Sequence, residues 1–417
     1  STILLKAAEY FENHEKEIIE VLAKESGSTF AKASIEVFAT ALTLKVAASY
    51  PEKMDEETVV PSGIPGKVNH VYRRPLGVVG VISPFNFPLV LSMRSIAFAI
   101  AVGDTVVHKP DFQTAISGGT VIAKAFEEAG LPAGVFNLIL ADIKDIGDAF
   151  IEHPVPGFIS FTGSTAVGKH IGAVSGQNLK KVALELGGNS PLLVLEDADL
   201  EKAVNAAIFG KFIHQGQICM ITNRILVHRS LYDEFVKRYV ERASELKYGD
   251  PTDPSVVIGP IINERQLEKV LSFAKMAEED GATVALRGER VGNVITPFVF
   301  TDVTNDSRIA QTEIFGPIAT IIPFDSEEEG IRLANDTDYG LSAAVFTEDL
   351  DRGLKVARQI ESGMAHVNDQ TVNEEANMPF GGEKGSGIGR FGGEWAFEEF
   401  TTVQWVSVQE KPREYPF

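Results

Sequence analysis

Residues 158–170, FISFTGSTAVGKH, join a short strand pattern to a helical pattern through a Gly-Ser turn. Backbone N–H groups at such a helix start, together with the helix dipole, can hold a phosphate. Gly163 and Gly168-Lys169 also fit the spacing of a nucleoside-triphosphate loop, but His170 stands where that loop needs a magnesium-binding hydroxyl. A dinucleotide pyrophosphate needs no metal, so the stretch favours a dinucleotide over ATP, with a ligand-free turn as the alternative.

The same alternation of strand and helix patterns extends to both sides of this unit. Strands alternating with helices of this length predict right-handed βαβ units and parallel sheets, and therefore an α/β fold. Before the turn the expected strands are 78–83, 105–110 and 135–140, and the expected helices are 89–102, 113–129 and a segment ending near 152. After it we expect strands at 181–186, 192–195 and 225–228, and helices at 199–213 and 231–246.

Two C-terminal segments do not fit this alternation. TTVQWVSVQ (401–409) reads as a lone strand with no later strand to pair with, which is typical of a strand that joins another sheet or another subunit. GSGIGR (385–390) superficially resembles a dinucleotide fingerprint, but it lacks the last glycine spacing and no βαβ pattern surrounds it. We expect a flexible loop there.

Composition restricts the function. The chain has 417 residues, enough for two or three domains, and a formal net charge of -20, which argues against nucleic acid as a partner. A single cysteine excludes an intrachain disulfide, the histidines show no metal-ligand spacing, and no apolar run is long enough for a membrane span. We expect a cytoplasmic protein without a metal. Ser1 leads directly into an amphipathic helix, so the true N-terminus is expected to lie upstream.

Three residues are placed where chemistry could occur. Cys219 lies in a loop beside a glycine, where a substrate could reach a thiol, although a lone cysteine is more often buried filler. Glu185 ends an apolar strand, where burial would raise its pKa toward that of a general base; a surface charge is the alternative. Asn86, between Phe and Pro residues, could direct an amide N–H at an oxyanion or serve only as a turn residue.

Seven ordered segments together resemble the signature segments of the aldehyde dehydrogenase superfamily. The resemblance covers almost the whole chain, and the spacing of Glu185 and Cys219 also follows the family pattern. The segments are SPFNFP (83–88), KPD (109–111), FTGSTAVG (161–168), LELGGNSP (184–191), GQIC (216–219), TEIFGP (312–317) and PFGGEKGSGIGR (379–390).

The resemblance implies a role for each matching residue. Cys219 would be the thiol nucleophile, Glu185 the base that activates water, and Asn86 the amide of the oxyanion hole. Gly163 and Ser164 would hold the pyrophosphate, Lys109 the adenosine ribose, and Glu313 with Phe315 the nicotinamide ribose. Further implied cofactor contacts are Ile82, Ser83, Phe85, Phe112, Gly168 and Leu186, and implied substrate contacts are Phe87, Arg94, Ile218 and Met220.

The family fold implied is a modified Rossmann cofactor domain, a second α/β catalytic domain and a small β arm for oligomerisation. We assign 1–56 and 76–187 to the cofactor domain, 188–395 to the catalytic domain, and 57–75 with 396–417 to the arm. A homodimer or homotetramer is therefore expected, with part of the cofactor domain upstream of Ser1. The implied cofactor is NAD, with NADP possible.

Departures from the family pattern concern specificity. Phe85 replaces a usual tryptophan, and Arg94 replaces a common aromatic residue of the substrate channel. Phe112 stands where NAD-preferring members carry a glutamate, so no carboxylate would repel a 2′-phosphate. Segments 92–95, 366–382 and 390–400 look most like the benzaldehyde and vanillin dehydrogenase branch. Succinate-semialdehyde, betaine-aldehyde or aliphatic-aldehyde oxidation, CoA acylation and a non-catalytic binding role remain as alternatives; a CoA-acylating member is expected to lack Glu185.

Overall fold

The Gly163-Ser164 turn lies at the carboxyl end of a central strand in the computed structural model, which describes residues 1–417. The strand and the helix that the stretch 158–170 predicts are β6 (Phe158–Thr162) and α8 (Thr165–Gln177). The strands β6, β3, β4, β5 and β7 are parallel to their neighbours, and β19 is antiparallel to β7. The order in this sheet is β19 (Gly387–Ile388), β7 (Lys181–Glu185), β6, β3 (Val78–Ile82), β4 (Thr105–Lys109) and β5 (Phe136–Leu138).

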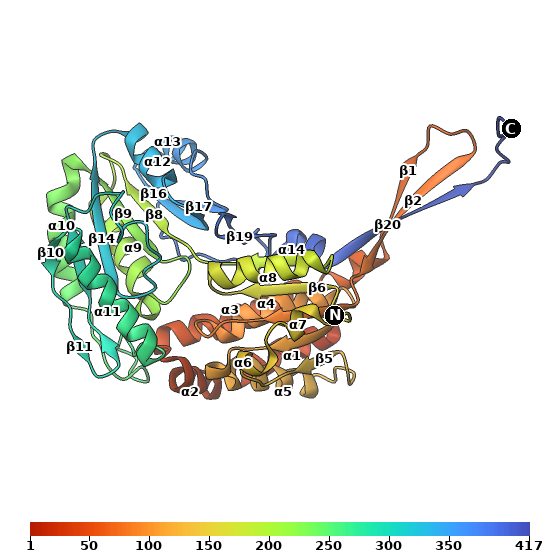
Figure 1. Ribbon diagram of the computed structural model, residues 1–417, viewed down its shortest axis with the longest axis horizontal. Helices are drawn as coiled ribbons and strands as arrows, with labels where there is room; N and C mark the ends of the chain where they lie inside the picture. Colours follow the sequence, from red (N-terminus) through yellow and green to blue (C-terminus); the bar gives the residue numbers. More distant parts are fainter.

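Helices cover both faces of this sheet (Figure 1). One face carries the largest apolar core, which includes Phe98 of α4 and Val79 of β3, whereas Phe161 and Ile171 belong to a smaller core under α8. No helix of the structure combines the length and apolarity needed to cross a bilayer. The helices of this lobe are α1 (Thr2–Asn13), α2 (Glu15–Ser26), α3 (Phe30–Ala47), α4 (Pro88–Ala101), α5 (Val121–Glu128), α6 (Ile143–Ile146), α7 (Ala149–Glu152), α8 and α14 (Gly393–Glu399).

A second sheet forms the other lobe. Successive side chains of its central strands enter different cores, as Leu192 and Leu193 do, because a strand directs alternate residues to opposite faces. The order is β10 (Thr283–Leu286), β13 (Phe298–Thr301), β14 (Ile318–Phe324), β9 (Thr222–His228), β8 (Ser190–Val194), β16 (Ser342–Phe346) and β17 (Met364–Val367). Its helices are α9 (Leu200–Phe212), α10 (Arg229–Ser244), α11 (Glu264–Glu279), α12 (Glu327–Asn335) and α13 (Leu350–Ala357). Two small two-stranded antiparallel sheets pair β11 (Arg290–Val291) with β12 (Val294–Ile295) and β15 (Tyr339–Gly340) with β18 (Glu383–Lys384).

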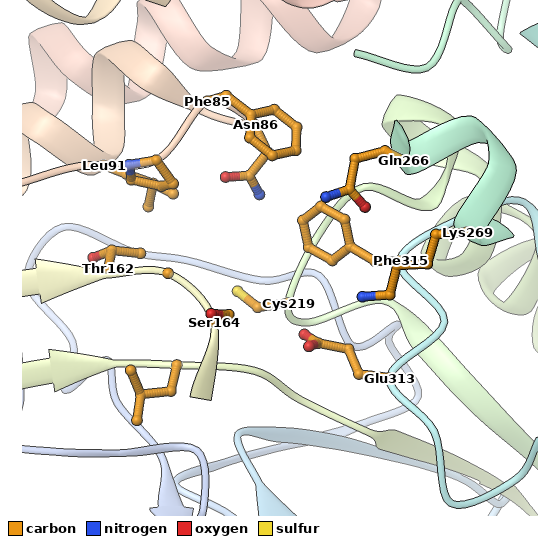
Figure 2. Close-up of a pocket in the computed structure, with 13 residues that line it drawn as sticks. Phe85, Asn86, Leu91, Thr162, Ser164, Cys219, Gln266, Lys269, Glu313 and Phe315 are labelled. Atoms are coloured by element: carbon orange, nitrogen blue, oxygen red, sulfur yellow. The ribbon is translucent and has the colours of Figure 1, made fainter. Parts of the chain in front are cut away.

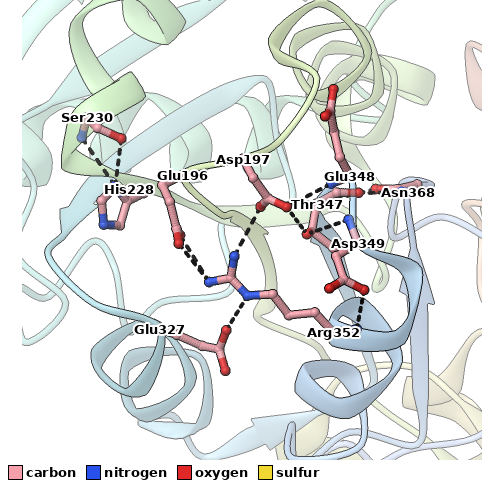
Figure 3. Close-up of polar contacts among 10 residues, drawn as sticks. All are labelled: Glu196, Asp197, His228, Ser230, Glu327, Thr347, Glu348, Asp349, Arg352 and Asn368. Atoms are coloured by element: carbon pink, nitrogen blue, oxygen red, sulfur yellow. Dashed lines mark hydrogen bonds and ion pairs between the residues drawn. The ribbon is translucent and has the colours of Figure 1, made fainter.

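Arg352 fastens helices of the second lobe to the end of β8 (Figure 3). Its guanidinium on α13 donates to Glu196 at 3.0 Å, Asp197 at 3.3 Å and Glu327 at 2.6 Å. A planar fork shared by three carboxylates is geometrically more specific than an isolated surface ion pair. The network therefore holds α12 and α13 against the second sheet, in which β9 is the strand that follows Cys219.

A three-stranded antiparallel sheet extends away from both lobes (Figure 1). The strand expected at 401–409 is β20 (Thr401–Gln409), and it pairs with β2 (Lys67–Pro75), which in turn pairs with β1 (Glu57–Pro61). Every residue of β20 after Thr401 is exposed, including Trp405. A long, unpaired edge of this kind is available for pairing with another chain.

The segment 385–390 is not the flexible loop expected from the sequence. Gly387 and Ile388 pair antiparallel with Glu185 and Leu184 at the edge of the first sheet. Gly387 has φ 151°, and a Cβ atom on it would overlap the Leu184 carbonyl oxygen. The glycines therefore permit close strand approach. The strand pairing also joins this segment to the first sheet.

Two helices differ from the expectation in length. The 113–129 pattern divides into a 3-10 turn, one π turn at Ile116–Thr120 and the short α5. The segment ending near 152 forms two single turns, α6 and α7, separated by Gly147 with φ 52°. The 113–129 pattern is interrupted where the Glu25 carboxylate of α2 accepts the N–H groups of Ile116 and Ser117. The segment ending near 152 is interrupted at Gly147, which has a positive φ.

Replacing Gly168 by alanine should destabilise the α8–β7 contact, because the added Cβ would overlap the buried Leu186 side chain. We expect a loss of about 1–3 kcal/mol in the free energy of unfolding. Gly176 on the same helix has no atom within 4 Å of a built Cβ, so Gly176→Ala should instead stabilise by about 0.5–1 kcal/mol. Urea unfolding of both variants checks this. Equal effects would mean that Gly168 is not a packing glycine.

Candidate active site

Two cavities meet at Cys219 and Asn86. The first, of about 640 Å³, lies between the turn after β3, the turn before α8, and α11 of the second lobe. The second, of about 940 Å³, opens from the same residues toward α3 and α9. Cys219, Asn86 and Leu91 line both. A ligand in one cavity can therefore meet a ligand in the other beside the Cys219 thiol. Figure 2 shows Cys219 among the residues that line the first cavity.

The loop that carries Cys219 is held in an uncommon conformation by contacts from both lobes. His214 and Gln215 have left-handed φ values of 52° and 55°, which non-glycine residues adopt only when the surroundings impose them. The Gln215 side chain donates to the carbonyls of Gly27 at 3.1 Å and Pro260 at 2.9 Å. A Cβ on Gly188 would overlap the Cys219 carbonyl oxygen. These contacts fix the position of the thiol.

The Cys219 thiol is neutral in the resting protein. Burial raises its pKa to about 12, and the Glu185 carboxylate adds to the increase. Cys219 is nevertheless partly exposed, and its exposed part faces the cavities. Because the thiolate is the nucleophilic form, reaction at this sulfur requires a nearby proton acceptor.

Asn86 is anchored to the cysteine loop. Its side-chain Nδ2 donates one hydrogen bond to the Gln217 carbonyl at 2.9 Å, and the residue is 4% exposed. An amide NH₂ has two protons, so the second N–H is left for a ligand in the cavity. The geometry suits stabilisation of negative charge on an oxygen beside Cys219.

Glu185 lies at the end of β7, 1% exposed, with no hydrogen-bond partner on either carboxylate oxygen. Burial raises its pKa to about 7, although Arg94 and Arg390 act in the opposite direction. It lines neither cavity, but it lies close enough to Cys219 for its charge to raise the pKa of the thiol. The pairing of β7 with Gly387 holds its backbone in place.

Arg94 was expected in the substrate channel, but it lines neither cavity. It lies 3% exposed on α4, where its Nη2 donates to Thr162 Oγ1 at 3.0 Å. Its guanidinium carbon lies 4.5 and 4.7 Å from the centres of the Phe380 and Phe391 rings. The guanidinium nitrogens lie 3.9 Å from Glu185 and 3.9 Å from Glu374.

A buried ion pair that the sequence analysis missed supports the start of α4. Lys32 and Glu36, both fully buried on α3, form the pair, and Glu36 also accepts the N–H groups of Leu89 at 2.8 Å and Val90 at 3.3 Å. Lys32 Nζ lies 4.1 Å from the centre of the Phe87 ring. The pair thereby holds the turn that presents Asn86. Its only sequence signal is a Lys and a Glu four residues apart in an apolar helix.

The first cavity can accept a dinucleotide at the start of α8. Ser164 makes no side-chain capping bond, and the first turn of α8 carries no acidic residue, so its N–H groups suit an anion. Gly163 lines the cavity but gives its own N–H to the Glu185 carbonyl at 2.9 Å. Gly168 packs on Leu186, as described above, which leaves it a structural role in the turn.

The opposite wall of this cavity combines expected and unexpected residues. Glu313 accepts the Gly188 N–H at 3.0 Å, and burial raises its pKa to about 7. Phe315 meets Phe85 edge to face at 6.1 Å. Gln266 and Lys269 of α11 also line the wall (Figure 2), although neither belongs to a motif that the sequence analysis used. The polar, partly cationic wall fits a phosphate-linked cofactor.

Other expected cofactor residues lie beside this cavity but outside its lining. Ile82 and Lys109 are paired in register at the ends of β3 and β4. The Ser83 hydroxyl contacts His108 Nε2 at 2.9 Å inside the protein. Phe112 is 64% exposed on the turn after β4. The expected substrate residues Phe87, Ile218 and Met220 all line the second cavity, which is largely apolar.

Comparison with known proteins identifies the family of the chain. The aldehyde dehydrogenase family matches residues 1–406. A benzaldehyde dehydrogenase of Bacillus subtilis is 51% identical over 100% of this chain and 86% of its own, and a vanillin dehydrogenase of Corynebacterium glutamicum is 49% identical over 98% and 85%. The crystal structure of an NAD-dependent benzaldehyde dehydrogenase from Corynebacterium glutamicum superimposes with a TM-score of 0.90 at 45% identity, covering 100% of this chain and 85% of that one.

The family match, the level of identity and the α/β architecture with its antiparallel arm all lead to the same assignment. The chain therefore belongs to the aldehyde dehydrogenase family and is an enzyme that oxidises aldehydes with a nicotinamide cofactor.

Proposed function

We propose that this enzyme oxidises aromatic aldehydes of the benzaldehyde and vanillin type to carboxylic acids. The observation that carries the proposal is the meeting of two cavities at Cys219, one polar and one largely apolar. Phe87, Phe209 and Phe380 line the apolar cavity, which suits a flat aromatic ring. The names of the benzaldehyde and vanillin dehydrogenases that resemble the chain support the same substrate class.

An aldehyde that carries a second carboxylate, such as succinate semialdehyde, fits this cavity less well. Glu36 and Glu374 both contribute to its wall, whereas no arginine or lysine does. A buried anion without a cationic partner is costly, and two neighbouring carboxylates increase that cost. The charge of the wall therefore favours a neutral aldehyde.

The mechanism assigns one role to each central residue. Cys219 attacks the aldehyde carbon, while the free N–H of Asn86 and the Cys219 backbone N–H receive the negative oxygen. NAD(P), when bound in the first cavity, would supply the hydride acceptor, and loss of hydride from the adduct on Cys219 leaves a thioester. Glu185 then takes a proton from a water molecule, and the resulting hydroxide releases the carboxylic acid. The turn before α8 and the Glu313–Phe315 wall would hold the cofactor.

We also propose that the enzyme is a cytoplasmic homo-oligomer assembled through its arm. The exposed β20 edge, with Val403, Trp405 and Val408 accessible on a strand, supports pairing between copies of the chain. Pairing between copies at the β20 edge is compatible with a dimer and with a tetramer.

Cys219→Ala should abolish aldehyde oxidation while NAD binding stays within about twofold of wild type, since the thiol forms the covalent bond but lines only one point of the cofactor cavity. NADH formation with benzaldehyde measures aldehyde oxidation, and calorimetric titration with NAD measures cofactor binding. Residual turnover above a tenth of wild type would remove Cys219 from this role.

Glu185→Gln should still reduce one equivalent of NAD per site and then stop at the thioester, because the hydrolytic base is missing. Rapid mixing with benzaldehyde should show the NADH burst, followed by turnover slowed about 10²-fold or more. In wild type, hydrolysis should accelerate as pH rises through about 7, because Glu185 must lose its proton to act. Full-rate turnover in the variant, with no acyl group on Cys219 by mass spectrometry, would contradict the role.

Phe112→Glu should raise the preference for NAD over NADP tenfold or more, about 1.4 kcal/mol, because a carboxylate beside the ribose binds its hydroxyls and repels a 2′-phosphate. Leu350→Glu is the control: Leu350 is 66% exposed, close to the 64% of Phe112, but lies on α13 in the other lobe. The ratio of kcat/KM for the two cofactors is measured in both. Unchanged selectivity in Phe112→Glu would place the residue away from the ribose.

A further inference from the structure

Arg94 lies between two carboxylates that come from different parts of the chain. Its Nη2 is 3.9 Å from Glu185 Oε2, and its Nη1 is 3.9 Å from Glu374 Oε1. Neither distance is a hydrogen bond, and Nε and Nη1 have no hydrogen-bond partner at all. A buried guanidinium with unused donors and two carboxylates at equal distance can approach either one.

The two carboxylates differ in their access to solvent. Glu185 is 1% exposed, whereas the Glu374 side chain is 23% exposed. Glu374 lines the apolar substrate cavity and also a separate surface cavity of about 630 Å³, which it shares with His366, Asp369 and Glu375. Glu374 is therefore the more accessible of the two acids, and its charge acts on Glu185 both directly and through Arg94.

Two aromatic rings and a threonine limit how far the guanidinium can move. Its central carbon lies 4.5 Å from the centre of the Phe380 ring and 4.7 Å from that of Phe391, and Thr162 holds one nitrogen by a hydrogen bond. Cation–π contacts of this kind favour a charged guanidinium even without a close ion pair. Arg94 is thus a fixed positive charge that two acids share.

We propose that Arg94 is a positioning residue shared by Glu185 and Glu374, and that this sharing sets the pH range in which Glu185 acts as the base of thioester hydrolysis. The inference rests on the proposed role of Glu185. When Glu374 is ionised it attracts part of the Arg94 charge, which leaves Glu185 easier to protonate. Without Glu374, Arg94 is free to stabilise the ionised form of Glu185.

Other charged groups around these residues have to be considered. Arg390, beyond β19, lowers the pKa of Glu185, while its own guanidinium donates to the Gly382 and Gly389 carbonyls. The Cys219 thiol faces Glu185 from the cysteine loop but is neutral near pH 7. Burial raises the pKa of Glu374, Arg94 lowers it and Glu36 raises it. Arg94 is thus the charge common to both acids.

The proposal predicts shifts of opposite sign. Removing a cation from beside an acid raises its pKa, so Arg94→Met should move the acidic midpoint of thioester hydrolysis upward by about one pH unit. Removing a like charge lowers it, so Glu374→Gln should move the midpoint downward by about half a unit. Arg94→Lys keeps the charge and should restore most of the wild-type midpoint.

The experiment follows acid release from the acylated full-length enzyme after the NADH burst, as a function of pH, with benzaldehyde and NAD. Glu375→Gln is the matched control, because Glu375 lines the same surface cavity and carries the same charge but makes no ion pair with Arg94. Its midpoint should equal that of wild type. KM for benzaldehyde should stay within about twofold in Arg94→Lys, since Arg94 lines neither cavity.

The outcomes separate this inference from the proposed function. A pH midpoint that persists in Glu185→Gln would refute Glu185 as the base. A midpoint that disappears in Glu185→Gln, but does not move in Glu374→Gln relative to Glu375→Gln, would overturn the sharing of Arg94 alone. A raised KM in Arg94→Lys with an unshifted midpoint would make Arg94 a substrate-binding residue and also overturn it. If Arg94→Met fails to fold, Glu374→Gln and Arg94→Lys still decide the question.

Discussion

The hydrogen bond from the Asn86 amide to the Gln217 carbonyl joins the two lobes at the point where both cavities begin. Asn86 belongs to the turn after β3 in the first lobe, and Gln217 precedes Cys219 at the entry to β9 in the second. Relative movement of the lobes would separate the amide from the thiol. The Lys32–Glu36 pair on one side and the Gln215 contacts on the other hold the two ends of this bond. The position of Asn86 relative to Cys219 is therefore fixed by this short polar contact, which is supported from both lobes.

A second constraint concerns how chain segments approach the end of β7. Glu185 is buried without partners, so the backbone around it has to be fixed by groups other than its own side chain. Gly387 pairs with it on one side, and Gly163 donates its N–H to the Glu185 carbonyl on the other. Glycine is needed at 387 because any Cβ would overlap the neighbouring strand. The carboxylate can then change protonation state while its backbone stays in place.

Local patterns predicted the repeated strand–turn–helix units well, because periodicity and turn residues act over short distances. They placed Cys219 and Asn86 in one site through an ordered set of motifs, and both residues do line the two cavities. The short β19 was missed because its partner lies about two hundred residues earlier and its glycines suggested mobility. Gln266, Lys269 and the Lys32–Glu36 pair were missed because their surface-type residues occur in ordinary helical patterns. The contacts of Arg94 with Phe380 and Phe391 could not be predicted, since no local pattern shows which distant residues pack on it.

The single thiol has a consequence for how the enzyme withstands oxidants. Burial and the Glu185 carboxylate raise the pKa of Cys219 far above neutral pH, which favours the protonated thiol. Peroxides attack thiolates, so this environment lowers the reactivity of Cys219 toward them. The low reactivity of Cys219 matters because the sequence contains no second cysteine with which a sulfenic acid could form a reducible disulfide. Burial of Cys219 thus protects the one cysteine of this sequence from oxidation. It also means that a proton acceptor is needed in every catalytic cycle.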